Sequence, residues 1–130
     1  MMQGAQLYAK TQVQTASSVQ VVVLLYDGVI QALKLAQEGI VKNNMMDKAR
    51  FLDRGLAVVN ELSASLDMEQ GGAIATDLRR LYEYVQHELT QANLHHDATR
   101  LNGPIRCLGV VREAWVEVAR QGSLAEAVGA

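Results

Sequence analysis

The sequence predicts an all-α protein, an antiparallel up-down four-helix bundle. In four long segments apolar residues recur every three or four positions, which is the spacing of one helix face. Short breaks rich in Gly, Asn or Pro separate these segments, and short links place successive helices antiparallel. The chain has 130 residues, 49% of them apolar, which is enough for one core. We therefore expect residues 1–130 to form a single domain.

The first helix is expected to begin at Ser17, which can cap it, and to end near Lys42. Residues 19–23 include four valines, and β-branched residues favour a strand. We predict a helix because the helical spacing continues to Ile40 and no other segment could pair as a strand. Residues 1–14 are polar with few apolar anchors, so we expect a mobile arm there, with at most a helical turn.

The second helix is expected to follow a cap at Asn44 and to stop around Asp67. Gly71 and Gly72 then predict a hinge before the third helix, because glycine tolerates backbone conformations that end a helix. The third helix should close at residues 93–96.

The last helix follows the strongest break in the sequence. Residues 97–101 could form a helical turn, and Asn102-Gly103-Pro104 predicts a break followed by a restart, because proline is tolerated only in a first turn. The last full helix is therefore expected from Gly103 to Gly122. Residues 123–130 are expected to form a frayed tail.

Some of the helices carry a second apolar stripe beside the one that a bundle core requires. On the first helix it comprises Val21, Leu24, Leu25 and Gly28, and on the second Phe51, Gly55, Val58 and Leu62. At about 25 cal/mol per Å² of apolar area, leaving such side chains in water forfeits several kcal/mol. The arm, a second copy or a partner could cover them. Alternatively, wide stripes merely surround a well-filled core, and the sequence leaves both interpretations open.

No residue pattern in the chain indicates catalysis or a metal site. A di-metal bundle needs inward-facing Glu-x-x-His pairs, which are missing. His87 is isolated, and the adjacent His95 and His96 point in different directions, so we expect surface or loop positions. Cys107 is expected to be a small buried hydrophobe. With no phosphate-binding loop and no Gly-x-Ser-x-Gly motif, we predict a non-enzyme without a cofactor.

Charge and composition narrow the choice of partner and compartment. A net charge of −2 argues against a nucleic-acid surface, which would be basic. The most apolar run, residues 19–30, falls short of the roughly 20 residues that span a bilayer, so no membrane insertion is expected. The N-terminal residues do not resemble a secretory signal, and a single cysteine is compatible with a reducing compartment. These features permit a cytoplasmic protein but do not establish one.

Five short motifs occur in order between about residues 8 and 115. They are Leu25-Tyr26-Asp27-Gly28, Leu66-Asp67-Met68-Glu69 with Gly71-Gly72, Leu81-Tyr82-x-Tyr84, Ala92-Asn93 and Arg112-Glu113-Ala114-Trp115. In this order and spacing they resemble the FliS family, the flagellar export chaperones that are cytoplasmic partners of flagellin.

The resemblance implies an antiparallel helical bundle that binds the disordered C-terminal segment of flagellin in apolar grooves. Such binding prevents premature polymerisation and aids delivery to the flagellar export gate protein of the type III system. In this family the N-terminal arm covers part of the apolar surface, and Tyr8 stands where an arm aromatic is expected. The expected partner-binding residues are Tyr8, Val21, Leu24, Leu25, Gly28, Phe51, Gly55, Val58 and Leu62.

Two other functions are weighed against this one. The runner-up is a self-associating helical scaffold or adaptor, with the second stripes buried in a homodimer. A metal-binding bundle is disfavoured because the ligand spacing is missing.

Overall fold

The computed structural model describes the backbone of residues 18–129 and the side chains of residues 18–122. Its elements are α2 (Ser18–Val41), α3 (Met45–Ala64), α4 (Met68–His95), the 3₁₀ helix η1 (Ala98–Leu101) and α5 (Asn102–Gly129). The described residues contain helices and no strand, which confirms the all-α four-helix bundle. The predicted arm, residues 1–14, lies outside this part of the chain.

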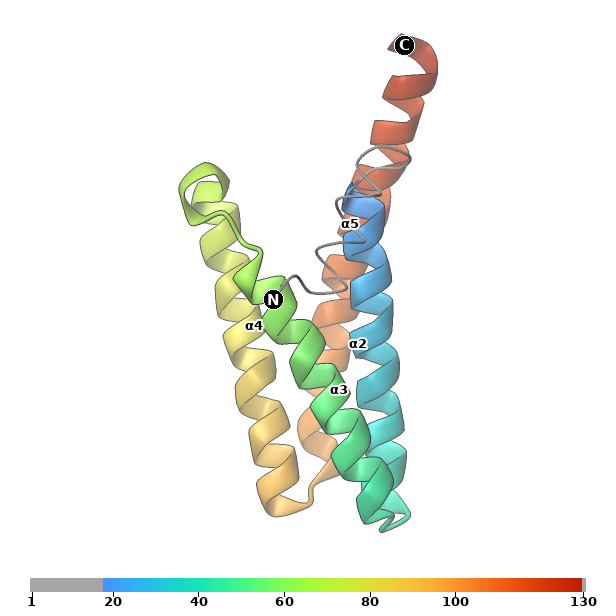
Figure 1. Ribbon diagram of the computed structural model, residues 1–130, viewed down its shortest axis with the longest axis vertical. Helices are drawn as coiled ribbons and strands as arrows, with labels where there is room; N and C mark the ends of the chain where they lie inside the picture. The colour runs from blue at the N-terminus through green and yellow to red at the C-terminus, as the bar shows by residue number, and fades with distance from the viewer. Residues whose placement is uncertain (1–17, 130) are drawn as a thin grey trace, which may run out of the picture.

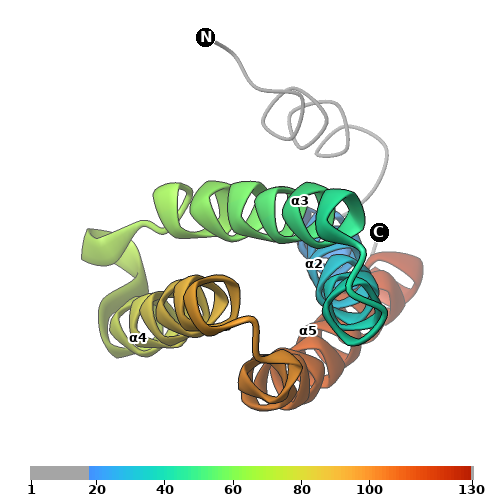
Figure 2. The same ribbon diagram turned by 90° about the horizontal axis from the view of Figure 1, so that it is seen from below.

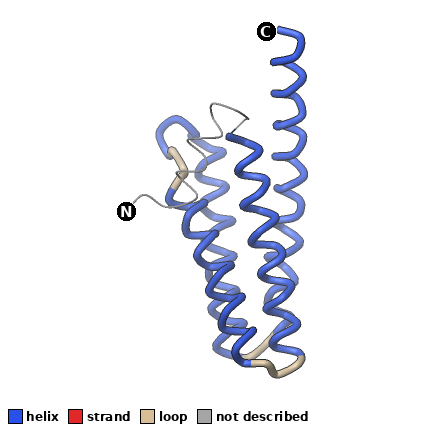
Figure 3. Tube along the Cα trace, turned by 45° about the vertical axis from the view of Figure 1, so that its right-hand side comes forward, coloured by secondary structure: helices blue, strands red, loops and turns tan. Residues whose placement is uncertain are grey.

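The bundle is closed at one end and open at the other. Figure 1 shows the α2–α3 turn and the α4–η1 link together at the lower end, which we call the base. Seen from below, α2 lies between α3 and α5, while α4 lies beside α3 (Figure 2). Of the four pairs of neighbouring helices, α4 and α5 touch least, and their upper ends diverge (Figure 1). Beyond this open end α5 extends further than the other helices (Figure 3).

Side-chain caps fix the turns between helices. The Asn44 side chain accepts a hydrogen bond from the Asp47 N–H at 3.1 Å, which confirms the predicted cap of α3. Asp67 caps α4 in the same way, accepting from the Gln70 N–H at 2.9 Å. Helix α4 therefore begins at Met68, ahead of the two glycines rather than after them.

The predicted glycine hinge is present inside α4. Gly72 has φ 52° and ψ −126°, outside helical geometry, and it separates a short first turn from the rest of the helix. A side chain is strained in this conformation, whereas glycine adopts it freely. The hinge thus depends on the residue type at one position.

The break before α5 takes the form of a change in helix type. Helix η1 passes directly into α5 at Asn102, and Pro104 is buried in the first turn, where its missing N–H costs little. Gln37 on α2 holds this junction, donating to the Ala98 carbonyl at 3.0 Å and to the Asn102 Oδ1 at 2.8 Å.

The predicted end of the last helix at Gly122 is wrong, because α5 continues to Gly129. One glycine in a helix costs about 1 kcal/mol relative to alanine. The residues after it include Leu, Ala and Glu, which are good helix formers and offset that cost.

The core lies between α2, α3 and α4, and η1 and the start of α5 close it. The buried stripe of α2 runs from Tyr26 to Ile40, and it packs against buried residues of the other elements. These include Leu52, Val59, Val85, Leu89, Leu101 and Leu108. At the centre the hydroxyls of Tyr26 and Tyr82 are hydrogen-bonded at 2.7 Å, with their rings edge to face.

We predict that Gly72→Ala lowers the free energy of unfolding by about 1–3 kcal/mol, because alanine is strained at this φ and ψ. Gly109→Ala is the matched control. Its added Cβ meets nothing within 4 Å in a helical segment, so it should raise stability by about 0.5–1 kcal/mol. Urea unfolding of both variants measures the difference, and equal effects would contradict a strained hinge.

Candidate functional site

A groove runs along one face between α2 and α5, toward which side chains of both helices point at i, i+3 and i+4 spacing. We call it the α2–α5 groove. Its upper part has a volume of about 320 Å³ and is lined by Gln20, Val23, Leu24, Val116 and Ala119. Its lower part has a volume of about 540 Å³ and is lined by Asp27, Ile30, Gln31, Lys34, Ile105, Gly109, Arg112 and Glu113.

An ion pair stands between the two parts of this groove. The Arg112 Nε donates to the Asp27 carboxylate, and the Arg112 Nη1 donates to the Glu113 Oε1 at 2.9 Å. The hydrogen bond to Asp27 raises the pKa of Arg112 above its ordinary value, so the guanidinium stays charged. The groove is therefore mainly apolar above this ion pair and carries charged side chains, including Lys34, in its lower part.

A second apolar site, the open-end pocket, lies where α4 diverges from α5. It has a volume of about 390 Å³ and receives side chains from all four helices. Its wall comprises Val22, Leu62, Leu66, Ile74, Ala75, Leu78, Tyr82 and Trp115, and its remaining lining is Ser65, Asp67, Gln70 and Gly71. Ile74 is 69% exposed, so the pocket is accessible from solvent.

Polar atoms are buried at the inner wall of the open-end pocket. Tyr82, which lines it, is hydrogen-bonded to Tyr26 behind it, and burial is the main cause that raises the pKa of both hydroxyls. Both tyrosines therefore stay protonated near neutral pH. The Trp115 Nε1 is buried and lies toward the Tyr26 hydroxyl, where its polar interaction opposes the pKa rise of Tyr26, although the contact falls short of full hydrogen-bond geometry.

The site residues predicted on α2 fall into three environments. Leu24 is 53% exposed and lines the α2–α5 groove, and Gly28 is exposed with open space around its Cα. Leu25 is partly buried against the core. Val21 is 2% exposed, so it is a buried side chain and not part of a free surface.

On α3 the predicted second stripe is partly core, which corrects its assignment to a surface. Gly55 is buried, and a Cβ there would lie 3.0 Å from the Leu33 side chain. Leu62 is 3% exposed and forms the inner wall of the open-end pocket. At the start of the same helix Ala49 is exposed, and the inward position is taken by Lys48, a charged residue.

The two remaining residues predicted on α3 are half-buried. Phe51 packs against the core, with the guanidinium groups of Arg50 and Arg54 over its ring at 5.1 and 5.3 Å from the centroid. Val58 also packs against the core. The predicted arm residue Tyr8 lies outside the described residues.

On α5 the groove wall differs from the stripe expected there. The sequence pattern favours a second stripe of Cys107, Val110 or Val111, Ala114 and Val118. The groove is instead lined by Ile105, Gly109, Arg112, Val116 and Ala119. These positions follow i, i+4 and i+7 spacing, which is the signal that could have found them. Cys107 is partly buried.

A polar contact at the base has no counterpart among the sequence patterns. Lys48 is buried, and its Nζ donates to the Asn93 carbonyl at 3.1 Å and lies 3.0 Å from the His96 Nδ1. His96 ends α4 in the left-handed conformation, with φ 51°. This contact joins α3 to the end of α4 and accounts for a lysine in a core position.

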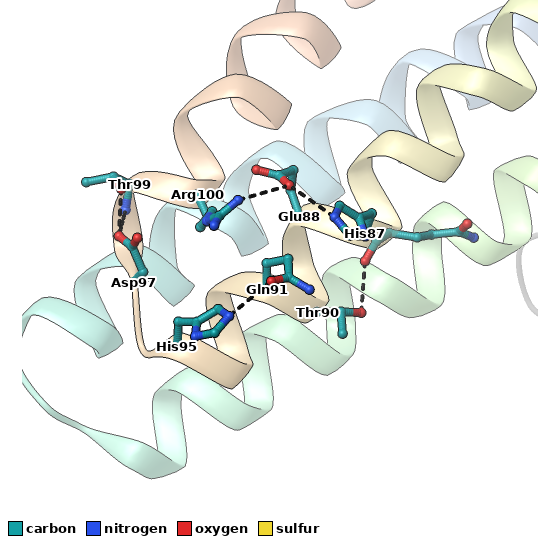
Figure 4. Close-up of polar contacts among 9 residues, drawn as sticks. His87, Glu88, Thr90, Gln91, His95, Asp97, Thr99 and Arg100 are labelled. Carbon is teal, nitrogen blue, oxygen red and sulfur yellow. Dashed lines mark hydrogen bonds and ion pairs between the residues drawn. The ribbon is translucent and has the colours of Figure 1, made fainter.

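The other histidines are at the surface, as predicted. Figure 4 shows the His87 ring beside Glu88, which also meets Arg100 at 3.7 Å, and His95 beside Gln91 at 3.1 Å. Nearby, Asp97 accepts from both the N–H and the hydroxyl of Thr99, and the hydroxyl bond is the main cause that lowers its pKa. No group of three metal-ligating side chains occurs among the described residues.

Helix α2 has the length and apolar composition of a membrane-spanning helix. Its buried residues nevertheless form the centre of the bundle core, with α3 and α5 packed on it. A core helix of a soluble protein has the same composition, so these properties alone do not indicate insertion.

We predict that Leu62→Asp unfolds the protein or lowers its melting temperature by more than 10 °C, because it buries an unpaired charge. Leu24→Asp should shift the melting temperature by at most about 3 °C, because that side chain is half-exposed. Thermal unfolding followed by circular dichroism measures both, and a folded Leu62→Asp variant would contradict the core assignment.

Comparison with known proteins gives one consistent family. The family model described as "Flagellar protein FliS" matches residues 1–122. The chain is 34% identical to the flagellar secretion chaperone FliS of Salmonella typhimurium over 94% of this chain and 91% of that protein. The FliS chaperone of Escherichia coli K12 is 32% identical over 92% of this chain and 89% of its own length. That of Bacillus subtilis is 25% identical over 83% of this chain and 80% of its own length.

These matches span nearly the whole bundle, and all of them are to secretion chaperones rather than to enzymes. The resemblance inferred from the motifs is thereby confirmed. The chain belongs to the FliS family of flagellar secretion chaperones.

Proposed function

We propose that the protein is a cytoplasmic chaperone that binds the disordered C-terminal segment of flagellin. Binding prevents premature polymerisation and aids delivery to the flagellar export gate. The single observation that carries this proposal is the α2–α5 groove on a chain of the FliS family, which is apolar in its upper part and lined by both apolar and charged side chains in its lower part. Membership of a family of flagellar secretion chaperones supports a flagellar partner.

The groove has the dimensions that an amphipathic helix requires. It follows α2 from Gln20 to Lys34, which is about 21 Å at 1.5 Å per residue. A partner helix of about four turns can lie along it with anchors at i, i+3 and i+4. Its apolar side chains would meet Leu24 and Val116 in the upper part, and Ile30 and Ile105 in the lower part.

A disordered partner fits the chemistry of such a groove. The free segment forfeits about 2–5 kcal/mol of the interaction energy when it orders on binding, which moderates its affinity. Moderate affinity suits a cargo that must later be released. On binding, the apolar side chains of the segment leave water and contact the groove. Those side chains are then not available to other flagellin subunits.

The alternative is self-association, in which a second copy covers the same groove. In that case the free protein is a homodimer at micromolar concentration, and Leu24→Asp makes it monomeric. Light scattering of the wild-type protein with and without the flagellin segment distinguishes the two. A monomer that forms a 1:1 complex supports the chaperone proposal.

We predict that Leu24→Asp and Val116→Asp each weaken binding of the flagellin C-terminal segment at least tenfold, because each places a charge in the apolar groove. Val41→Asp is the matched control, since Val41 is 76% exposed at the base, away from the groove. Isothermal titration calorimetry measures the affinities. Equal weakening by all three variants would refute the groove as the binding site.

We further predict that deleting residues 1–14 leaves the bundle folded, because the buried residues of the described part, from Val21 to Ala119, pack against one another. The deletion should strengthen flagellin binding or leave it unchanged, since an arm that occupies an apolar surface lowers apparent affinity by the fraction of closed molecules. Titration of both proteins with the same segment tests this. A large loss of affinity would instead make the arm, with Tyr8, part of the binding site.

A further inference from the structure

The link between α3 and the main part of α4 forms one wall of the open-end pocket. It comprises residues 65–71, which we call the link segment, and it lies at the end opposite the base (Figure 3). Its residues on the pocket lining are Ser65, Leu66, Asp67, Gln70 and Gly71. The remaining lining residues lie on the main parts of the four helices. A movement of the link segment therefore changes how far the pocket is open.

Few contacts hold the link segment on the bundle. The Asp67 side chain accepts from the Gln70 N–H at 2.9 Å, and the Asp67 carbonyl accepts from the Gly71 N–H at 2.8 Å, so these hydrogen bonds stay within the segment. Within residues 18–122, no side chain of residues 67–71 forms a hydrogen bond or ion pair with another helix. Leu66 is the one apolar side chain of the segment that packs against the core. Segments with so few contacts open at lower cost than the whole fold.

Two adjacent glycines shape the end of the link segment for different reasons. Gly72 supplies a backbone turn, with φ 52° and ψ −126°, that separates the segment from the rest of α4. Gly71 lies so close to α4 that an added Cβ would be 2.6 Å from the Ala75 Cβ, well inside the contact distance of two carbon atoms. Ala75 is 3% exposed, and its short side chain cannot turn aside. The position of the segment thus depends on the missing side chain at residue 71.

We propose that the link segment is a lid on the open-end pocket. It pivots at Gly72, and Leu66 together with the close contact between Gly71 and Ala75 holds it closed. In this closed position the pocket has a volume of about 390 Å³. When the lid swings away, the apolar wall behind it, which includes Trp115, becomes more exposed. The inference rests on the pocket and the link segment alone and does not depend on the partner proposed above.

The two positions of the lid differ by few interactions. On opening, Leu66 gives up its contacts with the core, which is the burial of one half-buried side chain. The open segment gains backbone entropy, most of all at its two glycines. The pivot lies beyond Ala75 and Tyr82, so the core contacts of α4 are the same in both positions. An open form that differs so little in free energy is populated as a minor state.

A lid suits an apolar pocket that is empty for part of the time. While closed, it withdraws apolar surface from water, where such surface promotes unwanted association. While open, it admits an apolar group that is larger than the mouth beside Ile74 allows.

Trp115 reports the position of the lid, because it is the only tryptophan and it lines the pocket. Acrylamide quenching of its fluorescence measures access to the indole ring. Gly71→Ala forces the segment away from Ala75, so the quenching constant should rise at least about twofold while the circular dichroism spectrum stays helical. An unchanged quenching constant would overturn the proposal.

Gly39→Ala is the matched control. It is the same substitution with a comparable clash, 2.8 Å from the backbone nitrogen of Lys48, but it lies at the base. It should lower the melting temperature and leave the quenching of Trp115 unchanged. If it raises quenching as much as Gly71→Ala does, the effect is a general loosening of the bundle and the lid is refuted.

A double variant tests the contact that holds the lid. Ala75→Gly removes the atom that the new side chain in Gly71→Ala would meet. The quenching constant of the double variant should therefore return to within about 20% of that of Ala75→Gly alone. Additive effects of the two substitutions would show that this contact does not hold the segment.

Leu66→Ala tests the second attachment and serves in place of Gly71→Ala if that variant does not fold. It should also raise the quenching constant about twofold, because the lid loses its one apolar contact with the core. Leu94→Ala is the control, since Leu94 is 71% exposed near the other end of α4. If Leu66→Ala and Leu94→Ala quench alike, the link segment is a fixed wall and not a lid.

Discussion

The close contact between α2 and α3 is the constraint on which the rest of the bundle depends. Two glycines allow it. A Cβ on Gly39 would lie 2.8 Å from the backbone nitrogen of Lys48, and a Cβ on Gly55 would lie 3.0 Å from the Leu33 side chain. With these helices so close, the large α2 side chains fill the space toward α4. Helix α5 then packs mainly on the other side of α2, and little contact is left between α4 and α5. The open-end pocket follows from this uneven packing.

Sequence patterns predicted the helices well because their ends carry local signals. Asn44 caps a helix through its own side chain, and Gly72 allows a backbone conformation that other residues resist. Both signals act within a few residues, so they can be recognised without knowledge of the tertiary fold. The predicted helix end at Gly122 was wrong because a single glycine is a weak local stop signal when good helix formers follow it.

The candidate sites were only partly predictable. Periodicity shows that a helix has apolar faces, but it does not show which neighbour each face meets. Gly55 and Leu62 therefore looked like a surface stripe although they are buried, and Leu24 was the one predicted residue found in the α2–α5 groove. The buried position of Lys48 depends on acceptors 45 and 48 residues away, a separation that no local pattern reports. The burial of the Trp115 nitrogen toward Tyr26 is likewise a tertiary property.

The attachment of α4 at the base has a mechanical consequence. The bonds from Lys48 to the end of α4, and from Gln37 to η1 and Asn102, hold the base, while the opposite ends diverge. Between the hinge at Gly72 and its end at His95, helix α4 is about 34 Å long at 1.5 Å per residue, so a rotation of about 6° about its base would displace the hinge end by nearly 4 Å. That displacement is about the diameter of a methyl group. A lever anchored in this way converts a small change of angle at the base into a large change in the width of the open end.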